Sequence, residues 1–110
     1  FGGGMGRLRE VCGTFSGAVI VVNALYGYSD PKNVQAKTEL YSRIQELAAQ
    51  FRRDNGSIIC KELLGLSRPE GSPIPEARTD EYYKKRPCPE LCRYSANMLE
   101  EYIREHPPVK

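Results

Sequence analysis

The stretch that decides the fold is residues 11–26, VCGTFSGAVIVVNALY. Its apolar residues recur every three or four positions, which is the spacing of one helical face. The β-branched run from Val19 to Val22 is also compatible with a buried strand, but a stripe that continues over four turns favours a helix. The stripe consists of Val11, Phe15, Ala18, Val19, Val22, Leu25 and Tyr26. We therefore predict a helix over residues 11–26, closed by Gly27 in the left-handed conformation.

A second long helix is predicted from Pro31 to Asn55. Ser29 and Asp30 supply capping side chains, Pro31 suits the first helical position, and Gly56 follows the predicted end. Its core stripe is Leu40, Tyr41, Ile44, Leu47, Ala48 and Phe51.

A last long helix begins at Cys88-Pro89 and is stopped by Pro107-Pro108. Its expected core stripe is Leu91, Cys92, Ser95, Leu99 and Ile103. Ser57 caps a short helix between these elements, with Cys60 in its first turn and Gly65 at its end. Residues 66–87 contain four prolines and predict a long loop. The expected fold class is all-α: a small bundle of three main helices plus one short helix, with a long Pro-rich loop.

Length and charge exclude several classes of protein. The 110 residues are enough for one domain, 1–110, and the formal net charge of +2 gives no strong field for an anionic partner. The longest apolar run, Ala18 to Val22, is far shorter than the roughly 20 residues that cross a bilayer. We expect no nucleic acid and no membrane among its partners.

The first predicted helix is apolar on more than one side. Ile20, Val21 and Ala24 lie off its core stripe, and such a second apolar side is normally covered. The chain begins at Phe1 without an initiator methionine, so we interpret it as a fragment that lacks an upstream helix. We expect Ile20, Val21 or Ala24 to be exposed here, or to be covered by a second copy in a homodimer.

The reactive groups are four cysteines, against one histidine. Cys12, Cys60 and Cys88 lie near predicted helix starts, where backbone N–H groups and the macrodipole favour a thiolate. A dithiol/disulfide pair or the ligands of an iron–sulfur cluster would need such thiolates, so these three are the candidate catalytic residues and metal ligands. Their sulfurs are then expected in one pocket. The alternative is that they are small apolar side chains that pack in the core.

Cys92 follows Cys88 by four positions on the expected core stripe, which favours packing over ligation. We therefore expect it to alkylate more slowly than Cys60 and Cys88. The glycine-rich residues 2–6 lack the spacing of a dinucleotide or phosphate loop, which favours a turn where backbones approach closely.

Four segments in order, FGGGMGR (1–7), VCGTFSGA (11–18), SIICKELLG (57–65) and Cys88 at the start of the last helix, resemble the C-GCAxxG-C-C family of redox-active proteins. The resemblance covers nearly the whole chain and implies that Cys12, Cys60 and Cys88 are the family's later three cysteines. Thr14 replaces the usual alanine, a change expected to alter packing only. The family's first cysteine belongs to a helix upstream of the glycine-rich loop, which this chain lacks.

The resemblance also implies kinship with the helical part of split-Soret cytochromes, in which a similar cysteine set is associated with an iron–sulfur centre. The leading hypothesis is a redox-active protein that uses Cys12, Cys60 and Cys88 as a thiol/disulfide pair or as iron–sulfur ligands. We expect a redox partner protein and a cytoplasmic location; whether the chain is an enzyme stays open. The alternative is a helical protein-binding or assembly module with structural cysteines.

Overall fold

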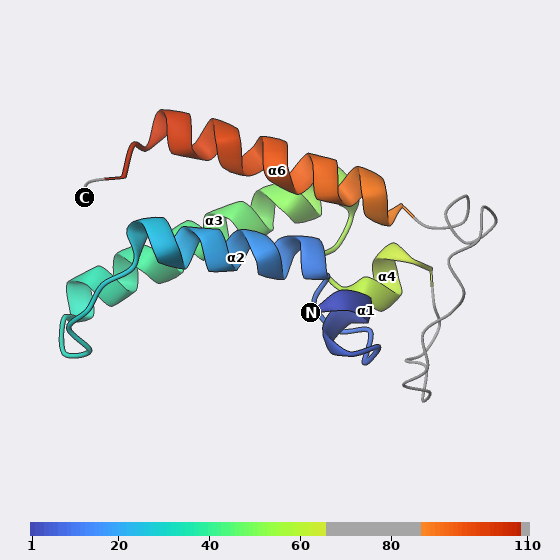
Figure 1. The fold of residues 1–110 in the computed structure, drawn as a ribbon, viewed down its shortest axis with the longest axis horizontal. Coiled ribbons are helices and arrows are strands. Elements are labelled where there is room, and N and C mark those ends of the chain that lie inside the picture. The colour runs from blue at the N-terminus through green and yellow to red at the C-terminus, as the bar shows by residue number, and fades with distance from the viewer. Residues whose placement is uncertain (66–86, 109–110) are drawn as a thin grey trace.

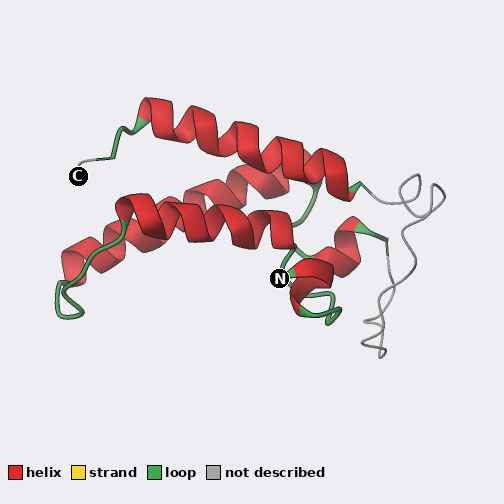
Figure 2. Cartoon of the chain, in the orientation of Figure 1, coloured by secondary structure: helices red, strands yellow, loops and turns green. Residues whose placement is uncertain are grey.

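The computed structural model describes residues 1–65 and 87–108, and all its named elements are helices (Figures 1 and 2). They are α1 (Gly2–Met5), α2 (Gly13–Tyr26), α3 (Val34–Asn55), α4 (Cys60–Leu63) and α6 (Cys88–Glu105). Within the described ranges there is no strand, and β pairing is limited to one isolated bridge. The all-α prediction is confirmed. Residues 66–86 of the predicted Pro-rich loop, 66–87, lie outside the described residues.

The three long helices pack around a core in which α2 contacts both α3 and α6. In Figure 1, α2 and α6 run in the same direction and α3 runs in the opposite one. Phe51 of α3 is fully buried, and its ring makes edge contacts with Phe15 at 5.6 Å and Tyr94 at 5.5 Å between centroids. The core is Cys12, Phe15, Ala18, Val22, Leu40, Leu47, Ala48, Phe51, Leu91, Met98 and Tyr102. The main positions of the α2 stripe are therefore confirmed.

Two boundaries of the long helices differ from the prediction. Gly27 follows α2 in an extended conformation, with φ −69° and ψ 169°, not in the left-handed one.

Helix α3 begins at Val34 instead of Pro31, because Asn33 caps it by accepting a 3.0 Å hydrogen bond from the Ala36 N–H. The predicted end of α3 is confirmed, since Gly56 follows Asn55 with φ 96°.

Two residues of the predicted core stripes face outward. Tyr41 on α3 is 54% exposed, and Cys92 on α6 is also exposed. Each lies one position after a buried leucine, and one residue turns the helix by about 100°. On α6 the buried positions are Leu91, Ser95, Met98 and Tyr102, at spacings of four, three and four. The core interpretation of Cys92 was therefore wrong, and Met98 and Tyr102 had been missed.

The second apolar side of α2 is open. Ile20 is 51% exposed, Val21 is 37% exposed, and Ala24 is exposed too. This confirms the exposure expected from the sequence, while the homodimer stays a prediction. None of the helices in the described ranges has the length and apolar character needed to cross a bilayer.

Candidate functional site

A short backbone ladder joins residues 10–12 to residues 58–60. Its centre is the antiparallel bridge between Val11 and Ile59. Two hydrogen bonds flank that bridge: Cys12 N–H donates to the Ile58 carbonyl at 2.7 Å, and Cys60 N–H donates to the Glu10 carbonyl at 2.6 Å. Successive side chains of an extended segment alternate between the two faces. Cys12 and Cys60 therefore lie on the same face of the ladder, opposite to Val11 and Ile59.

The register makes the two cysteines diagonal neighbours. Backbone positions in that relation are roughly 7–8 Å apart, with β-carbons somewhat closer. Both cysteines are buried, each with 8% of its surface exposed. The ladder thus places on one face two buried cysteines that are 48 positions apart in the sequence, and Figure 1 shows α1 and α4 at this end of the bundle.

Both cysteines lie where extended backbone changes to helix, near the predicted helix starts. The predicted Ser57 cap is wrong, because the N-cap of α4 is Ile59 and Ser57 Oγ accepts a 2.9 Å hydrogen bond from the Ile59 N–H instead. Cys12 is the N-cap of α2, and its carbonyl accepts from the N–H groups of Phe15 and Ser16, each at 3.0 Å. Cys60 is the first residue of α4. Its N–H is used in the ladder, and that of Lys61 donates to the Arg9 carbonyl at 3.2 Å. These helix-start amides therefore hold the ladder together.

Cys60 has a charged neighbour, Arg9, that no sequence pattern indicates. Nη1 of Arg9 donates to the Cys60 sulfur at 3.7 Å, and Arg9 is only 4% exposed. Arginine is almost never fully buried without a partner. A guanidinium placed this way interacts more strongly with a sulfur that carries negative charge than with a neutral one.

The segment that delivers Arg9 is a left-handed turn. Gly3, Gly4, Met5, Gly6 and Arg7 all have φ between 64° and 71°, so α1 is not a right-handed helix. Met5 and Arg7, together with Arg9 at φ 62°, carry side chains in a conformation that costs about 1–2 kcal/mol per residue. Such strain persists where surrounding contacts fix the backbone, and it concentrates at functional sites.

Gly4 explains why this turn needs glycine. A β-carbon on Gly4 would lie 2.6 Å from the β-carbon of Cys60 and 2.7 Å from the Glu10 nitrogen. The turn is held in place by hydrogen bonds from Arg9 N–H to Gly3 and from Glu10 N–H to Gly4, at 3.1 and 3.0 Å. Its backbone therefore covers Cys60 directly. This confirms the predicted close approach of backbones in the glycine-rich segment.

Cys12 has a polar neighbour of its own. Its sulfur lies 3.1 Å from Oγ1 of Thr14, a hydrogen-bond distance in which either atom can donate. The carbonyl of Thr14 also accepts a 2.7 Å hydrogen bond from Ser95 Oγ, which ties the first turn of α2 to α6. The expectation that Thr14 alters packing only was incomplete, because its hydroxyl contacts the candidate thiol.

Cys88 is the first residue of α6 and is half-buried. In Figure 1 the first turns of α2, α4 and α6 lie at the same end of the molecule. None of the four cysteines, all of which are described, forms a disulfide with another. Participation of Cys88 in a common centre with Cys12 and Cys60 stays a prediction.

The described side chains do not fit a metal cluster. Across residues 1–65 and 87–108, no three or more Cys, His, Asp or Glu side chains are grouped so that they could hold one ion. An iron–sulfur cluster needs several thiolates that converge on it. The ladder supplies two buried cysteines on one face, Cys12 and Cys60, and the roles of Cys12, Cys60 and Cys88 as metal ligands stay predictions.

The exposed Cys92 changes one expectation about reactivity. Its slow alkylation was expected from burial on a core stripe, and that premise is wrong. Solvent access instead predicts that Cys92 is alkylated faster than the buried Cys12 and Cys60.

The comparisons with known proteins agree with the resemblance found in the sequence. Residues 1–102 match the model of a family described as "Putative redox-active protein (C_GCAxxG_C_C)". No curated protein and no solved structure matches the chain.

Proposed function

Because this chain belongs to the C_GCAxxG_C_C family of redox-active proteins, we propose that it is a thiol–disulfide redox protein whose reactive pair is Cys12 and Cys60. The observation that supports this pair is the ladder register, which puts both side chains on one face. Arg9 beside the Cys60 sulfur supports Cys60 as the attacking thiolate. The proposal includes Cys88 as a third, more accessible thiol at the same end of the bundle.

The reaction that we propose is exchange with a disulfide of a partner protein. The Cys60 thiolate attacks one sulfur of that disulfide, a mixed disulfide forms, and the first partner thiolate leaves. The Cys12 thiolate then attacks the Cys60 sulfur, which forms the Cys12–Cys60 bond and releases the second partner thiolate. This step requires the two backbones to move closer, because a disulfide joins α-carbons no more than about 7 Å apart. The two protons lost by Cys12 and Cys60 go to the two partner thiolates. The chain is oxidised by two electrons and the partner disulfide is reduced.

The cytoplasmic location is part of this proposal. Reducing compartments keep thiols reduced, and disulfides formed there are usually transient and catalytic or redox-sensing. No step is assigned to an iron–sulfur cluster, because the described donors do not fit one.

A redox titration of the whole chain tests the proposal. The protein is equilibrated in buffers of reduced and oxidised glutathione, quenched with acid, alkylated and mapped by mass spectrometry. We expect a two-electron transition and a Cys12–Cys60 disulfide, with the transition lost in Cys12→Ser and in Cys60→Ser. Cys92→Ser is the control, since Cys92 is exposed and should leave the transition unchanged.

Two outcomes would contradict the assignment. An intact two-electron transition in Cys12→Ser would remove Cys12 from the pair. A transition that depends on Cys88 but not on Cys60 would move the chemistry to the start of α6.

The exposed side of α2 favours the alternative, an assembly module with structural cysteines. Ile20, Val21 and Ala24 form an apolar surface that association would cover. This alternative predicts a dimer by light scattering that Val21→Lys dissociates, together with thiols that show no transition in the glutathione titration. A monomer that carries the two-electron transition would exclude it.

A further inference from the structure

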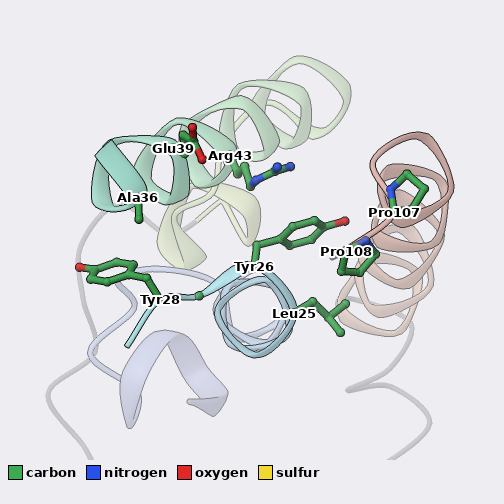
Figure 3. A pocket seen from close by; sticks show the side chains of 9 residues that line it. Leu25, Tyr26, Tyr28, Ala36, Glu39, Arg43, Pro107 and Pro108 are labelled. Carbon is green, nitrogen blue, oxygen red and sulfur yellow. The ribbon is translucent and has the colours of Figure 1, made fainter. Parts of the chain in front are cut away.

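A cavity of about 320 Å³ is lined by the end of α2, the first half of α3 and the residues after α6 (Figure 3). In Figure 1 these segments lie at the end of the bundle opposite to α1 and α4. The charged, aromatic and proline side chains that line the cavity are Tyr26, Tyr28, Glu39, Arg43, Pro107 and Pro108. The cavity therefore combines one cation, one anion, two aromatic rings and two prolines.

Arg43 is held in a defined position. Its guanidinium carbon lies 4.2 Å from the centre of the Tyr26 ring and 5.9 Å from that of Tyr102. Its Nη1 donates a 3.0 Å hydrogen bond to the Tyr102 hydroxyl. A cation fixed over aromatic faces loses little additional freedom when it binds an anion.

The same guanidinium keeps donors for a ligand. Arginine has five N–H groups, and within the described ranges Arg43 donates to a neutral hydroxyl and forms no ion pair with a carboxylate. A bidentate carboxylate matches the fork of the remaining donors. Arg43 is thus suited to bind a carboxylate that enters the cavity.

The wall opposite α3 is also fixed. The Tyr26 hydroxyl donates a 2.6 Å hydrogen bond to the His106 carbonyl, just before Pro107 and Pro108. The His106 ring stacks on Tyr102 with 4.3 Å between centroids. These contacts hold the two prolines beside Tyr26, as Figure 3 shows, so the apolar wall does not have to form on binding.

Glu39, an exposed residue of α3, adds a negative charge to the lining of the cavity. It lies four residues before Arg43 on α3, a spacing that puts the two side chains on one helical face. A polyanion such as a nucleotide would be repelled by this carboxylate. A ligand with an ammonium group next to a carboxylate can satisfy both residues.

We propose that this cavity binds a free α-amino acid with an apolar or aromatic side chain. Its carboxylate pairs with Arg43, its ammonium group faces Glu39, and its side chain packs between Tyr26, Tyr28 and the two prolines. The volume is at the lower end of the range for small-molecule sites, which suits a ligand of this size. This site does not depend on the thiol chemistry at the other end of the bundle.

Titrations of the whole chain with L-phenylalanine, followed by NMR chemical shifts, test the site. We expect saturable shifts at the amides of Tyr26, Tyr28 and Arg43. Phenylacetate lacks the ammonium group and phenethylamine lacks the carboxylate, and each should bind at least fivefold more weakly than L-phenylalanine. Equal affinities for all three compounds would overturn the zwitterion assignment.

Variants separate recognition from folding. Arg43→Gln should weaken phenylalanine binding at least tenfold, and Glu39→Gln should weaken it about fivefold without weakening the binding of phenylacetate. Arg52→Gln, an exposed arginine near the other end of α3, is the control. Ala36→Phe fills the cavity without removing the contacts of Arg43, and it should abolish binding while the helical circular dichroism is kept.

Two results would refute the site: no saturable shift with L-phenylalanine, or unchanged affinity in both Arg43→Gln and a folded Ala36→Phe. Cys12→Ser and Cys60→Ser should bind L-phenylalanine as tightly as the natural sequence does. Failure of the redox proposal and failure of this one are therefore distinguishable.

Discussion

Arg9 and Cys60 are 51 residues apart in the sequence, and the guanidinium of one lies 3.7 Å from the sulfur of the other. The pair exists because the ladder brings residues 10–12 to residues 58–60 and the left-handed turn directs Arg9 inward. A buried cation beside a buried thiol is the clearest electrostatic feature of the candidate site.

Arg9→Gln should slow alkylation of Cys60 at neutral pH by roughly three- to tenfold, because the thiolate is the reactive form and loses its nearby positive charge. The rate is measured by timed iodoacetamide labelling and mass spectrometry of the Cys60 peptide. Arg53→Gln, which changes an exposed arginine on α3, should leave that rate unchanged.

Arg9→Lys separates charge from access in this experiment. Lysine keeps the positive charge but not the planar fork, so the Cys60 rate should recover in part. Faster labelling of Cys60 in both Arg9 variants would mean that Arg9 only shields the sulfur.

Gly4→Ala should destabilise the fold by about 2–4 kcal/mol, because its β-carbon would overlap the β-carbon of Cys60 in a backbone conformation with φ 65°. Gly6→Ala is the matched control: its φ is 64°, and nothing lies within 4 Å of the added carbon. Gly6→Ala should lower the free energy of unfolding only by the cost of holding alanine in the left-handed conformation, about 1–2 kcal/mol. Urea denaturation measures both changes, and equal losses would argue against the overlap.

Gly17→Ala should stabilise the chain by about 0.5–1 kcal/mol. Gly17 is inside α2, and an added β-carbon would meet open space. Alanine loses less conformational entropy in a helix than glycine does. A decrease in the melting temperature would indicate that a close neighbour occupies this surface in solution.

Ionisation of Tyr94 should make the free energy of unfolding depend on pH in the alkaline range. Burial and its hydrogen bond to Asp54 raise the pKa of Tyr94 from 10.0 to about 12. The folded state thus holds this proton more tightly than the unfolded state does. The resulting stabilisation is complete below pH 10 and is lost as pH rises from 10 to about 12.

Urea midpoints measured across this range should fall more steeply for the natural sequence than for Tyr94→Phe, which has no phenol to ionise. Tyr41→Phe, which changes an exposed tyrosine on α3, should retain the natural slope. Identical slopes for Tyr94→Phe and the natural sequence would contradict this assignment.

The order of thiol labelling in the native protein should follow access. Cys92 is exposed and Cys88 is half-buried, whereas Cys12 and Cys60 are each 8% exposed. Cys92 should therefore react first, and Cys12 should react only as fast as the ladder opens. A limiting amount of a neutral maleimide, followed by peptide mapping, reveals the order; early labelling of Cys12 would contradict the described burial.

Local sequence determined the helices and most of their inward faces. The stripe of α2 predicted the burial of Phe15, Ala18 and Val22, and the exposure of Ile20, Val21 and Ala24 followed from the same periodicity. The Asn55-Gly56 end of α3 and the start of α6 at Cys88 were also predicted from neighbouring residues. These features depend on spacing and capping within one segment, which a sequence displays directly.

Tertiary structure alone decided the rest. Cys92 and Tyr41 belong to apolar stripes in sequence, but helix rotation against the neighbouring helices left both exposed. The pairing of residues 10–12 with 58–60, the burial of Arg9 and the contact of Gly4 with Cys60 all join segments about 50 positions apart. Because such pairings depend on how separate elements pack, the identity of the cysteines could be read from the sequence, whereas their partners could not.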